Sequence, residues 1–170
     1  IATSLSLPSD FFEPFIDRAP GALRALDYPD LAGQVPEPGQ LRAGPHTDYG
    51  GVTILDRQPG HAGLQIRSLD DEWVDAPVYE GSYTINVADL LARCTGDRWR
   101  STPHRVLPPA ADAPAEELIS LVFFHELDHD EVIETLSPPI GGGTEYEPVV
   151  CWDYLMSKFA QVTIGTTAGS

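Results

Sequence analysis

The sequence predicts a mainly β protein, either a β-barrel or a two-sheet jelly roll. Between about residue 22 and residue 125, eight short apolar or alternating runs are separated by clusters of Gly, Pro and Asp. Short strands at such spacing are typical of barrels and jelly rolls. A chain of 170 residues suits one domain, in which roughly 70% of the unfolded surface leaves water. We therefore expect residues 1–170 to form a single domain with a sizeable core.

The N-terminal segment predicts a short helix, and the strands follow it. Ser9 and Asp10 can cap a helix of about two turns over FFEPFIDR, with Glu13 supporting the cap. The eight runs then predict strands near 22–28, 41–48, 51–55, 63–67, 73–76, 81–87, 100–107 and 118–125.

Two further helices are expected. Asp89 can cap DLLARC (89–94), which interrupts the series of strands. Near the end of the chain, apolar residues recur at helical spacing and form a stripe that can pack on the outside of the sheet. These residues are Trp152, Leu155, Met156, Phe159 and Val162.

Composition excludes several classes of partner. The net charge of -16 repels both a phosphate backbone and an anionic membrane surface, so neither nucleic acid nor a membrane is an expected partner. No apolar run approaches the roughly 20 residues of a transmembrane helix. Cys94 and Cys151 are far apart and lack CxxC spacing, so they predict neither a zinc site nor a disulfide framework. Reduced thiols in a cytoplasmic protein are the simpler interpretation.

Three residues predict a metal site. His46 and Asp48 lie two positions apart in LRAGPHTDYGGVTIL, so both can reach one ion from a single strand end, helped by a bulge or turn at the glycines that follow. His104 lies in a second strand-like run. Two imidazoles and one carboxylate can occupy one face of an octahedral metal and leave the other positions open. Each element alone is weak, because His-x-Asp arises by chance and a lone histidine is usually a surface or core residue.

The sequence around these residues resembles that of a known family. The segments HTDYGGVTIL, GLQIR, INVADLL and GDRWRSTPHRV occur in the order found in the isopenicillin N synthase-like branch of the iron(II)/2-oxoglutarate-dependent dioxygenases. The resemblance extends from about Ala22 to about Val162. It implies a double-stranded β-helix (jelly-roll) core with a few flanking α-helices, and it implies that His46, Asp48 and His104 bind Fe(II).

The resemblance also implies an activity and a domain organisation. Such enzymes use 2-oxoglutarate and O2 to oxidise a small organic molecule by hydroxylation, desaturation or cyclisation. Relatives carry an additional N-terminal segment before the point that matches Ile1. We therefore expect residues 1–170 to be the catalytic domain without that segment.

The co-substrate site departs from the family pattern. Relatives usually carry Arg-x-Ser one strand beyond the distal histidine, and its arginine pairs with a carboxylate of 2-oxoglutarate. Here Ser120 is present, but Leu118 replaces the arginine. Tyr28 resembles the tyrosine that reaches the other end of the carboxylate. Arg24 shares its strand parity with Tyr28 and can supply the missing cation; alternatively, Arg24 is a surface residue whose stem covers apolar neighbours.

Strand parity also predicts which side chains line the pocket. Val52 and Ile54 should share a face with Asp48, and Val122 and Phe124 should share a face with Ser120, if no bulge intervenes. The remaining histidines match no ligand position and are expected to be solvated or to lie behind the ligands. They are His61, His125 and His129.

Two other functions stay open. One is an oxidase of the isopenicillin N synthase type, in which the substrate itself binds the iron and 2-oxoglutarate is not used. Loss of the usual arginine is the reason to retain it. The other is a catalytically silent β-barrel that binds a small ligand.

Overall fold

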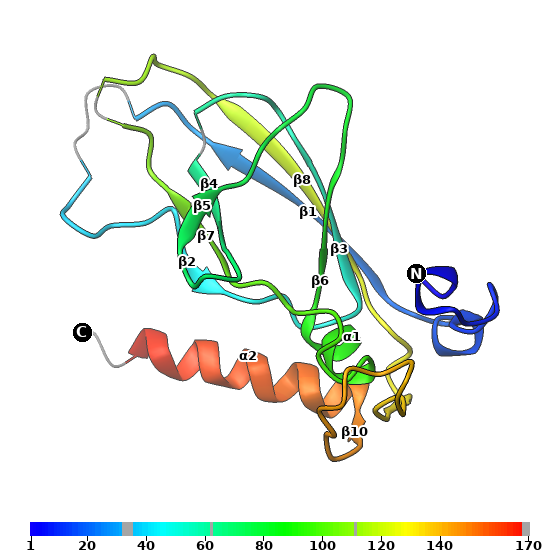
Figure 1. Cartoon of the computed structure of the whole chain (residues 1–170). Coiled ribbons are helices and arrows are strands. Elements are labelled where there is room, and N and C mark those ends of the chain that lie inside the picture. Colours follow the sequence, from blue (N-terminus) through cyan, green and yellow to red (C-terminus); the bar gives the residue numbers. More distant parts are fainter. Residues whose placement is uncertain (32–35, 62, 111, 168–170) are drawn as a thin grey trace.

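The fold consists of two facing antiparallel sheets with helices at one end (Figure 1). The computed structural model describes residues 1–31, 36–61, 63–110 and 112–167. Within these ranges the strands are β1 (Gly21–Tyr28), β2 (Ala43–His46), β3 (Val52–Arg57), β4 (Gly63–Arg67), β5 (Trp73–Asp75), β6 (Thr84–Val87), β7 (His104–Leu107), β8 (Leu118–His125), β9 (Val132–Ile133) and β10 (Val149–Val150). The helices are α1 (Asp89–Cys94) and α2 (Cys151–Thr167), and single 3-10 turns cover Thr3–Leu5 and Glu13–Phe15.

The strand order is that of a jelly roll. One sheet has the order β1-β8-β3-β6 and the other the order β2-β7-β4-β5, with neighbours antiparallel throughout. Neighbouring strands are mostly far apart in the sequence, as in a double-stranded β-helix. β9 and β10 form a separate small ribbon. The predicted mainly β jelly roll is confirmed, and each of the eight predicted runs overlaps one observed strand.

β8 shows why these runs form half-buried strands. Leu118, Ser120 and Val122 are buried, whereas Ile119 and Leu121 between them are exposed. This period of two places alternate side chains on the interior and the exterior of the sheet. β8 pairs with both β1 and β3. The cross-strand partners of its interior residues, on both strands, therefore also face the space between the two sheets.

The prediction of which β3 side chains line the pocket was wrong. Thr53, Leu55 and Arg57 face the interior, whereas Val52 and Ile54 do not line it. The reason is the turn at Gly50 and Gly51 between β2 and β3, after which the alternation restarts. A side chain at Gly50 would overlap the carboxylate of Glu126, so Glu126 would have to move to admit any other residue there.

The N-terminal helix prediction was also wrong. FFEPFIDR forms only the 3-10 turn at Glu13–Phe15, and no side chain caps it. The rings of Phe11, Phe12 and Phe15 pack on one another instead, with centroids 5.0 to 6.0 Å apart. Phe12 and Phe15 also contact a cluster of buried residues below the sheets that includes Leu90 and Leu127. Tertiary packing of the aromatic rings therefore replaces the helix that the capping pattern predicts.

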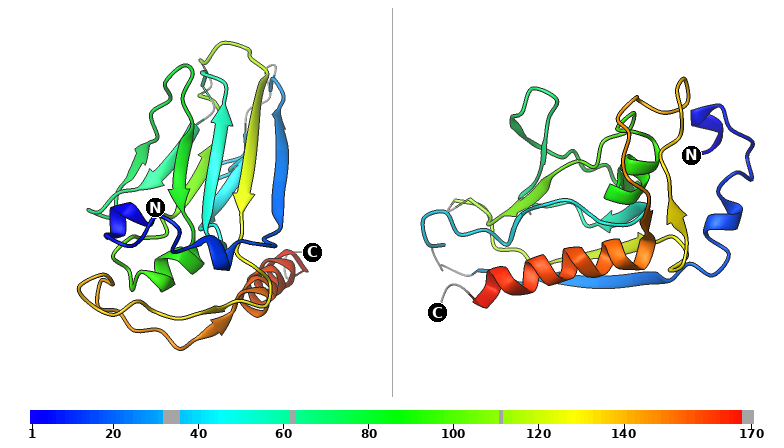
Figure 2. Two further views of the ribbon diagram at one scale, coloured as in Figure 1. Left: turned by 90° about the vertical axis from the view of Figure 1, so that its right-hand side faces the viewer. Right: turned by 90° about the horizontal axis from the view of Figure 1, so that it is seen from below.

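The helical layer closes one end of the two sheets (Figure 2). Its core cluster consists of Leu90, Cys94, Leu127, Ile133, Cys151 and Leu155. Leu155 of the predicted stripe is buried there, whereas Trp152 and Phe159 stay 43% and 50% exposed. The side chain of Val162 lies outside the described residues. The stripe therefore packs beneath the sheets and not on their outer face, which corrects the prediction.

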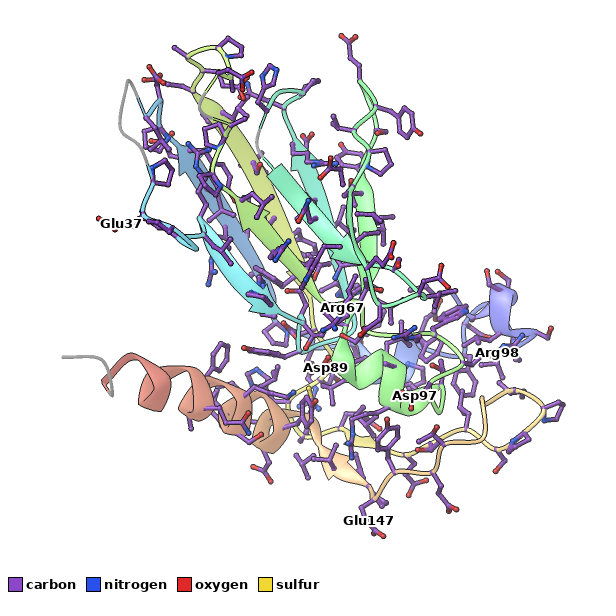
Figure 3. The ribbon with its side chains drawn as sticks, turned by 60° about the vertical axis from the view of Figure 1, so that its left-hand side comes forward. Glu37, Arg67, Asp89, Asp97, Arg98 and Glu147 are labelled. Atoms are coloured by element: carbon purple, nitrogen blue, oxygen red, sulfur yellow. The ribbon has the colours of Figure 1, made fainter. Side chains whose placement is uncertain are left out.

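A polar contact joins the two helices of this layer. Lys158 Nζ of α2 lies 2.9 Å from Asp89 Oδ2 of α1, and the Tyr154 hydroxyl donates to the same oxygen at 3.0 Å. Asp89, labelled in Figure 3, is the first residue of α1, and Ala88 takes the cap position that was predicted for Asp89. Among the described residues, no helix is both long and apolar enough to cross a bilayer.

Candidate metal centre

The structure brings His46, Asp48 and His104 to one point between the sheets. His46 ends β2 and His104 begins β7, and the two are direct partners across this strand pair. Their rings lie 4.3 Å apart between centroids, and His104 Nε2 lies 3.8 Å from Asp48 Oδ1. One ligand atom from each residue lies within 4.8 Å of the others. Among the described residues this is the one cluster of three or more His, Cys, Asp or Glu side chains with such spacing.

Both imidazoles are oriented by backbone carbonyls. His46 Nδ1 lies 2.7 Å from the Gly44 carbonyl oxygen, and His104 Nδ1 lies 3.2 Å from that of Thr102. Because a carbonyl only accepts, each Nδ1 carries the proton and donates it. In a neutral ring held in this way Nε2 keeps the lone pair, which is the form that binds a metal.

Asp48 is held by two side chains that the sequence analysis missed. Its carboxylate is 8% exposed, and its Oδ2 accepts from Thr53 Oγ1 at 2.6 Å and from Asn86 Nδ2 at 2.8 Å. Thr53 and Asn86 are direct partners on β3 and β6. These two bonds occupy Oδ2, and the other oxygen, Oδ1, faces His104. The available signal was Asn86, a polar residue between Ile85 and Val87 in INVADLL.

Local backbone contacts fix the loop that carries Asp48. β2 ends at His46, so Asp48 lies in the turn and not on the strand as predicted, while Thr47 points to a separate cavity beside α1. The first N–H groups of a helix lack partners inside it. In α1 the N–H of Asp89 donates to the Asp48 carbonyl at 2.9 Å, and that of Leu90 donates to the Gly50 carbonyl at 3.0 Å. The helix start therefore holds the ligand loop.

A further carboxyl group lies close to the centre. Glu126 follows β8, and its Oε2 is buried without a hydrogen-bond partner. Burial, and secondarily the charge of Asp48, raises the pKa of Glu126 to about 7. A neutral Glu126 avoids a second buried negative charge beside Asp48. Glu126 was not among the residues predicted from the sequence.

The centre opens into a cavity of about 640 Å³ between the two sheets. The predicted residues Tyr28, Ser120 and Arg24 all line it, as do Val122 and Phe124. Its apolar wall includes Leu26, Leu55, Leu64, Ile66, Val122 and Phe124. Burial raises the pKa of Tyr28, although nearby Arg42 opposes the shift, so the phenol keeps its proton and can donate it.

Three arginines reach this cavity in different surroundings. Arg24 is exposed and lies 5.6 Å from the centroid of the Phe124 ring. Arg42 covers the Tyr28 ring at 5.3 Å and donates to the Pro29 carbonyl at 2.9 Å. Arg57 is half-buried on the interior face of β3, and the sequence analysis gave it no role.

The remaining histidines lie away from the centre. His61 bonds to Glu116 through both its backbone N–H and its ring, His125 stacks on Phe123, and His129 packs on the Trp152 ring. None of the three belongs to the metal cluster, as predicted.

Comparisons with known proteins agree with this geometry. The family described as the 2OG-Fe(II) oxygenase superfamily matches residues 21–126. Validamycin A dioxygenase from Streptomyces hygroscopicus subsp. limoneus is 41% identical over 164 residues, which cover 95% of this chain and 45% of that protein. The 2-oxoglutarate-dependent dioxygenase frbJ from Dothideomycetidae sp. (strain 11243) is 34% identical over 140 residues, covering 82% of this chain and 38% of that protein.

A solved structure shows the same arrangement of elements. A full-length Neurospora crassa protein, crystallised in complex with alpha-KG and thymine, superposes with a TM-score of 0.84 at 32% identity, covering 95% of this chain and 50% of that one. The chain spans less than half the length of the two curated relatives above.

Proposed function

The chain belongs to the 2OG-Fe(II) oxygenase superfamily, and from this premise we propose that it is the catalytic domain of an oxygenase. The proposed enzyme is a mononuclear non-haem Fe(II), 2-oxoglutarate-dependent dioxygenase that oxidises a small organic molecule with O2. The outcome is hydroxylation, desaturation or cyclisation. The order of the four motifs supports placing it in the isopenicillin N synthase-like branch.

The observation that carries the proposal is the donor set of the centre. His46, His104 and Asp48 each offer one ligand atom, two imidazole nitrogens and one carboxylate oxygen, and these atoms lie within 4.8 Å of one another. Two neutral imidazoles and one carboxylate suit Fe(II), and no fourth ligand among the described residues joins them, so the site is open and not a closed structural one. Iron bound there supplies the oxygen-activating redox chemistry.

The chain's own residues orient these ligands and shape their surroundings. The carbonyls of Gly44 and Thr102 hold the two rings, and Thr53 and Asn86 hold the carboxylate. The apolar wall of the cavity limits the entry of water to the reacting centre. Tyr28 and Ser120 present hydroxyl groups to the same cavity and are proposed to bind the co-substrate carboxylate, with Arg24 as one candidate for the accompanying cation.

One observation favours a second candidate function. Leu118 is 6% exposed and uncharged on the interior face of β8, next to Ser120 along that face. A leucine cannot pair with a carboxylate, so an oxidase that binds its substrate directly at the iron and does not use 2-oxoglutarate remains the alternative. A catalytically silent ligand-binding barrel is the alternative from a different class.

We also propose a location and exclude a partner. Cys94 and Cys151 are free and buried, which supports the reducing conditions of a cytoplasm. The net charge of -16 argues against nucleic acid as a partner.

The test combines metal binding with oxygen consumption. Under anaerobic conditions, Fe(II) followed by 2-oxoglutarate should produce a weak visible charge-transfer band, and His104→Ala should abolish it. Oxygen uptake that requires added 2-oxoglutarate supports the dioxygenase, whereas uptake without it supports the oxidase. A protein that binds neither Fe(II) nor 2-oxoglutarate would refute the enzymatic assignment and leave the silent barrel.

A further inference from the structure

Arg57 is a half-buried cation without a counter-ion. It lies on the interior face of β3 and lines the cavity that contains the metal centre. Within the described part of the chain it forms no ion pair with an Asp or Glu. Burial, with no opposing carboxylate, lowers its guanidinium pKa. A charge in such a place is costly unless an anion joins it.

The hydrogen bonds of Arg57 orient the guanidinium and leave donors free. Its Nη2 donates to the carbonyl oxygens of Ala76 and Pro77, both at 2.6 Å. Its Nε is buried and has no hydrogen-bond partner. A guanidinium has five N–H donors in a rigid fork, and a carboxylate is the acceptor that matches this fork. Two neutral carbonyls therefore hold the group in place while its charge and its Nε–H remain unmatched.

The strand register places Arg57 beside Ser120. On the β3–β8 pair Arg57 is the direct partner of Ser120, and on the other side of β8 Tyr28 is the partner of Leu118. Side chains of direct partners lie on the same face, about 5 Å apart between Cβ atoms. Arg57 and Ser120 thus present one cation and one hydroxyl group at one level of the cavity, and Tyr28 presents a second hydroxyl group two residues away along β8, at Leu118.

The metal centre lies at another level of the same cavity. Thr53, which bonds Asp48, is four residues before Arg57 on β3, a separation of roughly 13 Å along the strand. The side chains at both levels extend into the shared space and shorten this gap. A linear dicarboxylate with its 2-oxo acid end at the metal centre can therefore direct its other carboxylate toward Arg57.

We propose that Arg57, together with Ser120, binds the distal carboxylate of the 2-oxoglutarate co-substrate. This assignment rests on the proposed function and identifies the residue that selects a 2-oxo dicarboxylic acid over a 2-oxo monocarboxylic acid. Arg24 is the rival cation, but it is exposed to water and pairs with Val122, nearer the metal level. Arg42 is occupied by the Tyr28 ring and the Pro29 carbonyl.

The test compares two ligands that differ only in the distal carboxylate. 2-Oxoglutarate and 2-oxopentanoate have the same chain length, and their affinities can be measured by calorimetry on protein loaded with redox-inert Mn(II). In Arg57→Met we expect the affinity for 2-oxoglutarate to fall about 100-fold. The affinity for 2-oxopentanoate should change less than about threefold, because that ligand offers nothing for the guanidinium to bind. Arg57→Lys, which keeps the charge but loses the fork, should weaken 2-oxoglutarate about tenfold.

Two control variants complete the design. Arg67, labelled in Figure 3, lies outside the cavity and pairs with Asp71, so Arg67→Met should leave both affinities unchanged. Arg24→Met tests the rival cation. Because Arg57→Lys retains a cation beside the two carbonyls, it carries the comparison if Arg57→Met does not fold.

The outcomes separate this assignment from the proposed function. Equal losses for both ligands in the Arg57 variants would indicate a structural role and overturn the assignment. A loss of 2-oxoglutarate binding in Arg24→Met but not in the Arg57 variants would also overturn it. Wild-type protein that binds Mn(II) but neither ligand would refute the proposed function itself, and the assignment with it.

Discussion

Replacing Thr53 by valine should weaken metal binding without disturbing the fold. The Thr53 hydroxyl is buried and donates to Asp48 Oδ2 at 2.6 Å, which is one of two bonds that aim Oδ1 at the metal position. A hydrogen bond to a charged group contributes about 1.5–3 kcal/mol, and such supporting bonds typically change metal affinity by about 10- to 100-fold. Because Asn86 keeps the second bond, we expect a loss of about 10-fold for Thr53→Val. Titration of Fe(II) or Mn(II) against a competing chelator measures it.

Thr84→Val is the matched control. Thr84 lies on β6, lines the same cavity and is paired with Leu55, but it forms no hydrogen bond to any of the three ligand residues. The same chemical change there should alter metal affinity by less than about twofold. Melting curves of both variants check that the fold is retained. Wild-type metal affinity in a folded Thr53→Val protein would contradict the role given to this bond.

Buried titratable groups give three further predictions. The carboxyl of Glu126, with a pKa raised from 4.5 to about 7, stays protonated in the folded state while the unfolded state loses its proton. The metal-free protein should therefore lose up to about 3 kcal/mol of stability as the pH rises from 4.5 to 7, and denaturation of Glu126→Gln across this range should lack that slope. Lys158→Met leaves the Asp89 carboxylate without its cation and should lower the free energy of unfolding by about 1–3 kcal/mol in urea titrations, whereas a melting point equal to wild type would show that the pair contributes nothing. Burial raises the pKa of Cys94 and of Cys151 to about 11, so iodoacetamide at pH 8 should label them only after denaturation, and rapid labelling of native protein would contradict the described core.

The strands and the candidate ligands were predictable because their signals are local. A short apolar run such as Leu118–His125, bounded by polar segments, predicts a strand whatever its partners are. His46 and Asp48 are two residues apart, and the glycines after them allow the turn that brings the carboxylate to the centre. The family resemblance supplied His104 as the third member of the set.

The N-terminal segment and the β3 wall were not predictable because distant contacts decide them. The helix expected over FFEPFIDR gives way to packing of its phenylalanine rings on the core cluster. Which side chains of β3 face the interior depends on the turn at Gly50. This turn lies against Glu126, which follows β8 and is far from Gly50 in the sequence. Local propensity carries no information on either contact.

By itself the sequence determined which segments contain strands and that His46 and Asp48 can bind one metal ion, because these depend on residue type and short spacing, and the family resemblance added His104. Only the tertiary structure decided that β8 lies between β1 and β3, that Thr53 and Asn86 meet at Asp48, and that Arg57 lies beside Ser120. The physical reason is that strand order and register are set by the packing of the whole sheet. Neighbours across a strand pair are therefore specified by the fold and not by their separation along the chain.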